Sequence, residues 1–349
     1  MKVIRVRNVH QALPEALYQL RLDGVERQSR NGPVTMFPEP VTTVYSSPKE
    51  RVIFWPERDA NPFFHLFESL WMLGGRNDVD YVAKFVPRMR EYSDNGQTFH
   101  GAYGFRWRKF FGRDQLRIII EALKRNPEDR RQVLSMWSGV EDLPARKSKD
   151  IPCNLQAVFQ ITHEGKLDMM VTNRSNDMVW GAYGANAVHF SILQEFMAKC
   201  IGVPVGVYRQ VSANFHVYDS VLEQVESLAD TVESWPLRKA NASNPYIDGD
   251  VTPYPLMTTI RTNWEIDLEM FLSQNLRQPY ADPFFDRVAQ PMLDAWEAFK
   301  DTRDSDRHRT ALAVLDAVEA EDWKLACMQW VNRRLIKFER AKDDGVSYE

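Results

Sequence analysis

Two short apolar runs lie close together in residues 151–177, IPCNLQAVFQITHEGKLDMMVTNRSND. The runs LQAVFQI and LDMMVT have the length and composition of strands, and HEGK at 163–166 has the composition of a hairpin turn. The pattern predicts that a sheet starts here. Cys153 directly precedes the first predicted strand and Arg174 follows the second. A thiol and a guanidinium group therefore lie at strand ends.

The flanking sequence alternates between helical and strand periodicity. Residues 62–73, PFFHLFESLWML, are apolar on nearly every side, which predicts a buried helix. Residues 114–125 and 187–201 repeat apolar side chains at helical spacing, whereas 205–218 alternates like a single strand. The middle of the chain is therefore predicted to be α+β.

The composition changes after about Ser234, where loops containing Pro and Asn give way to charged amphipathic helices. We predict a first domain over 1–234 and a helical C-terminal extension over 235–349, packed on the first. The final residues, KDDGVSYE, are polar and are expected to be loose.

Composition excludes several classes of function. The 349 residues carry 44 Lys and Arg against 48 Asp and Glu, a formal charge of −4, so we expect no direct binding to nucleic acid or a membrane. No segment has the apolar length of a signal peptide or membrane span, and a cytoplasmic location is expected. Three scattered cysteines argue against disulfides or zinc. The histidines at 65, 100 and 189 lack metal-ligand spacing, so we predict no metal.

Each candidate side chain has a structural interpretation beside the functional one. Cys153 is either an unreactive buried cysteine, as is common in proteins, or a nucleophile whose thiolate needs cationic neighbours. Arg174 either makes a solvated ion pair or lowers the thiol pKa and binds a phosphate. Arg130 and Arg131 either lie in a solvated loop or act together to bind an anion. Glu68, inside an apolar helix, is a paired core carboxylate or an active-site group.

Read in order, these pieces resemble thymidylate synthase and the related pyrimidine-nucleotide hydroxymethylases, including those of bacteriophages. The resemblance covers about Arg30 to Tyr218. It rests on motifs in the family's order: Phe67-Glu68-Ser69-Leu70-Trp71, Tyr103-Gly104-Phe105-Arg106-Trp107-Arg108, Asp129-Arg130-Arg131, Pro152-Cys153, Arg174-Ser175-Asn176-Asp177, Gly181, Asn186 and His216-Val217-Tyr218. It implies a three-layer α+β sandwich around a mixed sheet. Cys200 and Cys327 lie on apolar stripes of predicted helices, so we expect both in the core.

The resemblance also implies a role for each matched residue. Cys153 would attack C6 of a pyrimidine monophosphate, so that C5 takes a one-carbon unit from 5,10-methylenetetrahydrofolate. Glu68 and Tyr103 would handle protons around the base. The 5'-phosphate, base and sugar would contact Arg30, Arg130, Arg131, Arg174, Ser175, Asn186, His216 and Tyr218. Asp177 and Gly181 would meet the pterin, with Asp177 also catalytic. The paired arginines come from the other subunit in this family, which implies a homodimer.

The sequence departs from the family at several of these positions. Asn186 follows Asp177 one residue later than usual, so either Asn186 keeps its base-reading role after an insertion, which we favour, or Ala185 takes the slot. Tyr92 and Met89 stand where folate-packing tryptophans are usual, and Asn154 replaces the common histidine after the cysteine. No apolar C-terminal lid is recognisable.

These departures bear on the fate of the methylene intermediate. A dry, closed site gives a methyl group by hydride transfer, whereas a site that admits water gives a hydroxymethyl group. We therefore expect dUMP 5-hydroxymethylation, as bacteriophages use to build modified DNA. The alternatives are thymidylate synthesis, dCMP hydroxymethylation, and a nucleotide-binding homologue without catalysis.

Overall fold

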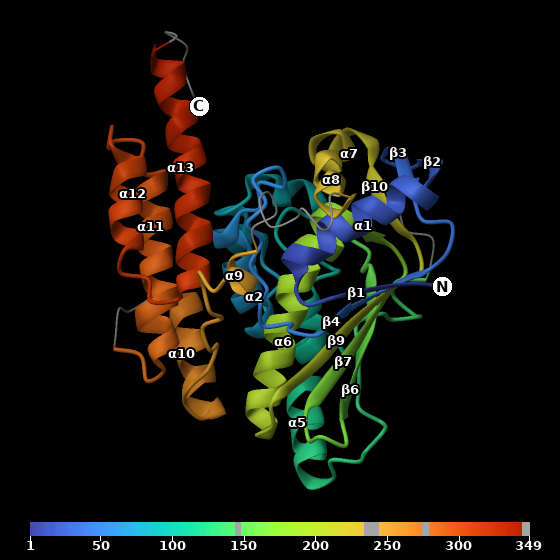
Figure 1. Ribbon diagram of the computed structural model, residues 1–349. Helices are drawn as coiled ribbons and strands as arrows, with labels where there is room; N and C mark the ends of the chain where they lie inside the picture. Colours follow the sequence, from blue (N-terminus) through green and yellow to red (C-terminus); the bar gives the residue numbers. More distant parts are fainter. Residues whose placement is uncertain (144–147, 234–243, 274–278, 344–349) are drawn as a thin grey trace. The chain divides into compact units, whose positions relative to one another are not determined.

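The computed structural model describes residues 1–143, 148–233, 244–273 and 279–343, which fall into two compact units (Figure 1). The first comprises Met1–Arg51 and Phe64–Asn244, and the second comprises Val52–Phe63 and Pro245–Glu349. The boundary expected at Ser234 and the residues after 343 lie outside the described residues. The second unit thus includes an N-terminal segment that sequence patterning did not associate with the extension.

A six-stranded mixed sheet forms the centre of the first unit. Its order is β1-β4-β9-β7-β6-β5; β1 pairs with β4 and β7 with β9 in parallel, and the other pairs are antiparallel. The strands are β1 (Lys2–Val6), β4 (Val41–Tyr45), β5 (Val133–Ser135), β6 (Asn154–Ile161), β7 (Leu167–Asn173) and β9 (Val205–Ser212). The predicted α+β class and mixed sheet are confirmed.

The predicted hairpin joins β6 to β7, and Gly165 has φ of +74° in its turn, which favours glycine. The prediction of one strand over 205–218 was wrong. The chain leaves β9 at Ala213, whose N–H donates to Asn173 O, and continues as β10 (Phe215–Tyr218) in a second sheet. In the sequence, apolar residues alternate without interruption at Val211, Ala213, Phe215 and Val217, although the buried positions change phase at the break. Periodicity alone therefore could not reveal it.

The second sheet has the order β2-β3-β10-β8. Strands β2 (Val25–Ser29) and β3 (Gly32–Met36) form a hairpin, β3 pairs antiparallel with β10, and β10 runs parallel to β8 (Asn176–Asp177). This sheet places the tip of the β2–β3 hairpin, the residues after β7 and the residues of β10 near one another.

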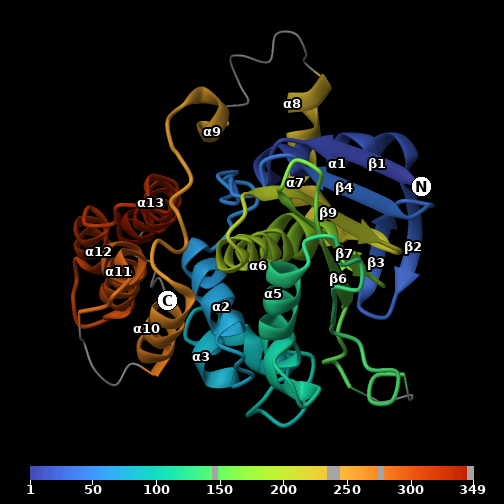
Figure 2. The same ribbon diagram turned by 90° about the horizontal axis from the view of Figure 1, so that it is seen from below.

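Helices cover the large sheet. The predicted buried helix is α2 (Pro62–Leu73). The helical spacing over 187–201 corresponds to α6 (Asn186–Ile201), which packs against β7 and β9 (Figure 2). Helix α5 (Gln115–Arg125) begins after Asp114, whose side chain accepts from Arg117 N–H as an N-cap. The remaining helices of this unit are α1 (Val9–Asp23), α3 (Val79–Ala83), α4 (Tyr103–Phe105), α7 (Asp219–Val225) and α8 (Asp230–Glu233), with 3-10 helices at Pro87–Tyr92 and Glu226–Ala229 and π-helical turns at Arg106–Phe110 and Met178–Ala185.

The second unit is helical, as predicted for the C-terminal region. Its helices are α9 (Pro245–Asp248), α10 (Arg261–Ser273), a π-helical turn (Phe285–Ala289), α11 (Gln290–Lys300), α12 (Arg307–Leu315) and α13 (Glu321–Asp343). Phe63 packs on Trp296 and Trp330, with ring centroids 5.4 and 5.8 Å away. Asp59 accepts hydrogen bonds from Arg333 and Arg334. These contacts join residues 52–63 to the helices.

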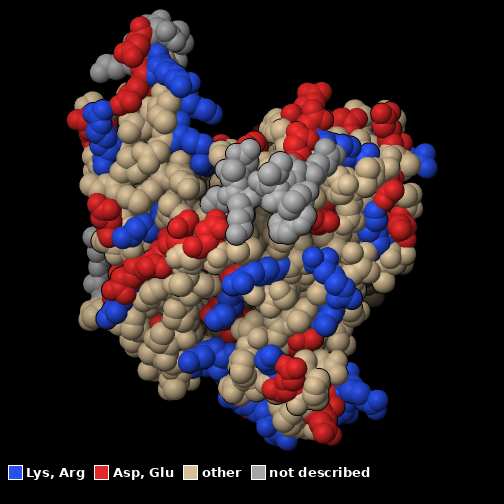
Figure 3. Space-filling view, in the orientation of Figure 1, with Lys and Arg blue, Asp and Glu red and all other residues tan. Residues whose placement is uncertain are grey.

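The surface carries both signs of charge. Figure 3 shows Lys and Arg interspersed with Asp and Glu over the visible face, in keeping with the net charge of −4. Within the described residues no helix is long and apolar enough to cross a membrane. Those same residues contain no group of three or more His, Cys, Asp or Glu side chains placed to hold a metal ion.

Candidate active site

Two cavities lie on either side of the segment that leads to Cys153. The larger, about 710 Å³, is lined by Arg27, Gln28, Ser29, Arg30, Asn31, Val34, Met36, Trp137, Ser148, Lys149, Ile151, Arg174, Ser175, Asn214, His216 and Tyr218. The smaller, about 200 Å³, is lined by Glu68, Trp71, Met72, Met89, Tyr92, Phe99, Gly101, Ala102, Tyr103, Lys149, Asp150, Ile151, Pro152, Ala185, Asn186 and His189. Lys149 and Ile151 line both, so the cavities adjoin.

The larger cavity brings together most of the residues predicted to hold the nucleotide. Arg30 comes from the β2–β3 turn, Arg174 and Ser175 from the connection after β7, and His216 and Tyr218 from β10. The small sheet assembles them although they are far apart in sequence. Two cationic side chains and a hydroxyl in one polar cavity form a local anion site in a protein with no overall positive charge.

Arg174 also fixes the segment before Cys153. Its Nε donates to Pro152 O at 2.9 Å and its Nη2 to Ile151 O at 3.1 Å, while its backbone N–H donates to Cys153 O at 2.9 Å. The guanidinium lies 6.0 Å from the centre of the Trp137 ring. Arg174 therefore couples the position of the thiol to the anion site.

Cys153 lines neither cavity, but it directly follows Pro152, which lines the smaller one, and its backbone contacts Tyr103, which lines the same cavity. Tyr103 Oη accepts from the backbone N–H groups of Cys153 at 3.1 Å and Asn154 at 3.3 Å. Burial raises the pKa of the Cys153 thiol, although the charges of Arg174 and Arg30 lower it. The expectation that the guanidinium groups favour the thiolate therefore holds in direction, but burial outweighs them. Burial and the neighbouring Cys153 also raise the pKa of Tyr103.

His216 and Tyr218 lie side by side on β10. Their rings meet edge to face with centroids 5.4 Å apart, and His216 Nδ1 is 2.8 Å from Asn214 Oδ1. Asn31 donates to Tyr218 Oη at 3.3 Å. Burial lowers the pKa of His216, and the charge of Asp177, its partner across the parallel strands, opposes that effect. A neutral imidazole and a phenol suit contacts with sugar hydroxyls.

Asn186 lies at the start of α6 within a chain of amides. Its Nδ2 donates to Asn176 Oδ1 at 3.0 Å, and its Oδ1 accepts from Asn154 Nδ2 at 3.4 Å. A Cβ on Gly181 would lie 2.6 Å from Asn176 Oδ1, so this close approach requires glycine. The backbone departs from helical angles at Tyr183 and Gly184, where an additional residue before Asn186 can be accommodated.

Asp177 caps the turn that leads to Asn186, because its Oδ1 accepts from Trp180 N–H. Neither Asp177 nor Gly181 lines either cavity in this chain. Ala185 lines the smaller cavity beside Asn186, but the amide network belongs to Asn186.

The smaller cavity combines apolar and ionisable groups. Met89, Tyr92 and Trp71 supply an apolar wall, and Tyr92 is 44% exposed. On α2, Glu68 Oε2 lies 3.0 Å from Nε2 of His189 on α6. Such a wall can pack against a flat heterocycle while the acidic group faces its reacting edge.

Arg130 and Arg131 are not brought to either cavity. Both are exposed in the loop before β5, and the Arg131 guanidinium donates to Asp129 at 2.8 and 2.9 Å. Within one chain they cannot contribute to the anion site.

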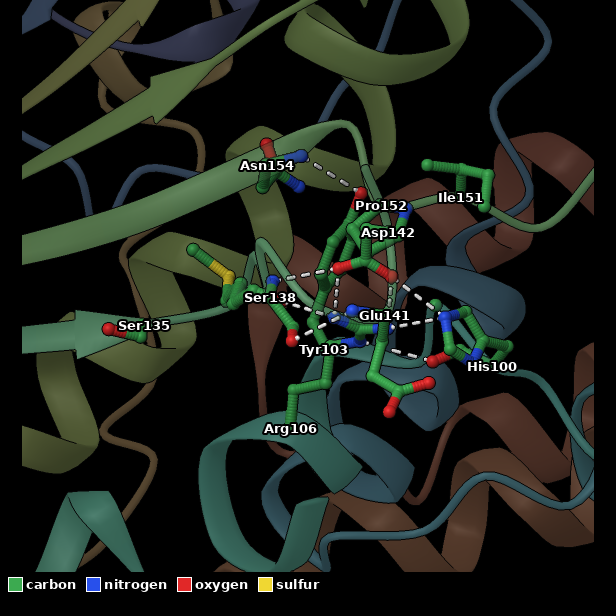
Figure 4. A network of polar contacts seen from close by, with 12 residues as sticks. His100, Tyr103, Arg106, Ser135, Ser138, Glu141, Asp142, Ile151, Pro152 and Asn154 are labelled. Atoms are coloured by element: carbon green, nitrogen blue, oxygen red, sulfur yellow. Dashed lines mark hydrogen bonds and ion pairs between the residues drawn. The ribbon is translucent and has the colours of Figure 1, made fainter. Parts of the chain in front are cut away.

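A buried ion-pair network supports the segment before Cys153 (Figure 4). Arg106 and Asp142 have fully buried side chains joined by hydrogen bonds of 2.7 and 2.9 Å, and His100 Nε2 lies 2.7 Å from Asp142. Burial alone would raise the pKa of Asp142, but hydrogen bonds from Arg106, Ser138 and His100 hold it below its ordinary value. The Asp150 carboxylate accepts hydrogen bonds from the backbone N–H groups of the consecutive residues His100 and Gly101.

We expect Asp142→Ala to lower the free energy of unfolding by about 3–5 kcal/mol, because it leaves the Arg106 charge buried and unpaired. Urea denaturation measures the change. Asp301→Ala, which removes the exposed ion pair with Arg303, is the control and should leave the urea midpoint nearly unchanged. Equal small effects from both variants would refute the structural role of the network.

Sequence reasoning missed several residues of the site. Arg27, Trp137 and Asn214 line the larger cavity, and Lys149 lines both. His189 was considered as a metal ligand alone. Its position one helical turn after Asn186 was the available signal, since residues three apart share a helix face.

The comparisons with known proteins agree with this geometry. The thymidylate synthase family model matches residues 17–245. The deoxyuridylate hydroxymethyltransferase of Pseudomonas phage M6 is 63% identical over 353 aligned residues, covering 100% of both chains. The protein of the same name from Bacillus phage SP01 is 40% identical over 190 residues, 51% of this chain and 49% of that one. The thymidylate synthase of Corynebacterium aurimucosum is 30% identical over 205 residues, 56% of this chain and 74% of that one.

Proposed function

The chain belongs to the thymidylate synthase family, and on this premise we propose that it is a deoxyuridylate 5-hydroxymethyltransferase. It transfers a one-carbon unit to C5 of dUMP and captures that carbon with water. The observation that carries this proposal is the 63% identity to the phage enzyme of that name over the whole of both chains. The reaction is assigned to the first unit, whose residues line both cavities.

In the larger cavity, Arg30, Arg174 and Ser175 bind the 5'-phosphate, and His216 and Tyr218 bind the sugar. The base then reaches Cys153, whose thiol adds to C6 and makes C5 nucleophilic. Asn186 reads the O4 and N3 edge, because its amide offers a donor and an acceptor. Tyr103 lines the smaller cavity and contacts the backbone of Cys153, so we place it beside C5.

The smaller cavity is the proposed site for 5,10-methylenetetrahydrofolate. That co-substrate supplies the one-carbon unit. The apolar wall of Trp71, Met89 and Tyr92 suits its ring system, and Glu68 lies beside it to handle protons. Asp177 and Gly181 shape this site through Asn176 and Asn186.

Two features favour water over hydride as the final reactant. The wall contains a half-exposed tyrosine and a methionine, which close a site less completely than two indole rings. The same cavity contains the buried polar pair Glu68 and His189. A polar cavity open to solvent retains ordered water.

The substrate assignment is tested by incubating the full chain and methylenetetrahydrofolate with dUMP or dCMP and weighing the products. We expect dUMP to gain one hydroxymethyl group and dCMP to be consumed at least about 100-fold more slowly. Preferential consumption of dCMP would contradict the assignment of the base.

We also propose a homodimer in which Arg130 and Arg131 of each subunit complete the partner's anion site. Their exposure and their distance from both cavities in one chain support this arrangement.

Complementation tests the shared site. Arg131→Ala and Cys153→Ser chains should each be almost inactive alone. When they are mixed after unfolding and refolding together, half of the dimers combine one of each, and one intact site in these gives about a quarter of wild-type activity. Activity that stays at the level of the separate variants would place Arg131 outside the partner's site.

A further inference from the structure

Glu68 and His189 face each other in the smaller cavity, although they come from different helices. Their carboxylate and imidazole atoms are 3.0 Å apart, and their side chains are 12% and 4% exposed. Placing two ionisable groups in such a buried position is costly unless each stabilises the other or acts on a bound molecule.

Neither facing atom has its hydrogen-bonding capacity filled. Glu68 Oε2 and His189 Nε2 are buried, and within the described residues neither makes a contact with hydrogen-bond geometry. Buried polar atoms are almost always bonded to protein or to ordered water. The cavity they line, about 200 Å³, is large enough to hold water. These atoms therefore mark a place for a water molecule.

The proposed function puts the base against the same cavity, because two residues assigned to the base line it together with His189. His189 lies one turn after Asn186 on α6, and residues at this spacing share a helix face. Asn186, Tyr103 and His189 all line the same cavity. Asn154, the residue after the nucleophile, donates a hydrogen bond to Asn186. Its amide side chain cannot act as an acid or a base.

We propose that His189, paired with Glu68, is the general base that deprotonates the water used in hydroxymethylation, an inference that rests on the proposed function. Histidine can accept and return a proton near neutral pH, and the adjacent carboxylate stabilises the imidazolium that forms.

The step balances without an additional reactant. The water oxygen bonds to the exocyclic carbon of the base while its proton passes to His189 Nε2. The electron pair of the exocyclic double bond moves into the ring as an enolate. That pair then forms the C5–C6 double bond, and the C6–Sγ bond breaks to release Cys153 as a thiolate. The imidazolium returns the proton to the thiolate through Glu68 and solvent.

A competing nucleophile separates water capture from the earlier steps. With a fixed concentration of a small thiol, the methylene carbon is captured either by water, as hydroxymethyl-dUMP, or by the thiol, as a thioether. We expect His189→Gln to lower the ratio of hydroxymethyl to thioether product about 100-fold. A thiol in excess needs no help from His189, so the total of the two products should fall much less.

His65→Gln is the matched control, because His65 is equally buried, at 5%, but lines neither cavity. Its product ratio should equal that of the wild type. In His189→Ala, added imidazole should raise the ratio again by filling the space left by the side chain. An unchanged ratio in folded His189→Gln, or equal loss of both products, would overturn the proposal. If the wild type makes no hydroxymethyl product, the proposed function fails instead.

Discussion

Cys153→Ser is expected to abolish turnover, with a loss of at least about 10⁴-fold in kcat, while the chain still binds dUMP. A serine hydroxyl is a far weaker nucleophile than a thiolate at C6. The phosphate and sugar contacts that we propose come from residues of the larger cavity, which Cys153 does not line. Steady-state kinetics and calorimetric titration with dUMP measure the two properties separately.

The control for Cys153→Ser is Cys200→Ala, which removes a buried cysteine on α6 outside both cavities. It should retain turnover. A Cys153→Ser chain that turned over at an appreciable rate would exclude covalent catalysis by this thiol. Loss of dUMP binding as well would show that Cys153 supports the structure of the anion site.

Asn186→Asp is expected to reverse the preference between bases. A carboxylate accepts from the 4-amino group of cytosine but repels O4 of uracil, so kcat/KM for dUMP should fall at least about 100-fold and that for dCMP should rise. The Asn176 amide that now accepts from Asn186 can rotate to donate to the new carboxylate, which limits the structural cost. Competition between the two nucleotides in one reaction measures the ratio directly.

Asn214→Asp makes the same change of charge in the larger cavity, next to His216. This variant should weaken the binding of dUMP and dCMP equally and leave the ratio of their kcat/KM values unchanged. If Asn186→Asp also left the ratio unchanged, base reading would belong to another residue, with Ala185 and its backbone the next candidate.

Local sequence patterns were sufficient to predict the parts of the site that lie within one continuous segment of the chain. The strands on either side of Gly165 place Cys153 and Arg174 at neighbouring strand ends, and this was predictable because hairpin residues pair with close neighbours in sequence. Helical periodicity predicted a helix from Ala187, one residue after the observed start of α6, whereas the role of Asn186 came from the family resemblance.

Contacts between distant segments could not be predicted from periodicity. The break between β9 and β10 depends on pairing with two different sheets, and the contact of Glu68 with His189 depends on how α2 packs near α6. Residues 52–63 belong with the C-terminal helices because of Phe63 and Asp59, whose partners lie more than two hundred residues away. In each case the information lies in tertiary packing.

The central claim is that water supplies the last atom to the product. The most direct test is a reaction of the wild-type chain with dUMP and methylenetetrahydrofolate in water labelled with heavy oxygen, followed by mass spectrometry of nucleotide and folate. We predict that 5-hydroxymethyl-dUMP carries the heavy isotope and that the folate is recovered as tetrahydrofolate. A methylated nucleotide without the isotope, formed together with dihydrofolate, would contradict the account and identify hydride transfer as the final step.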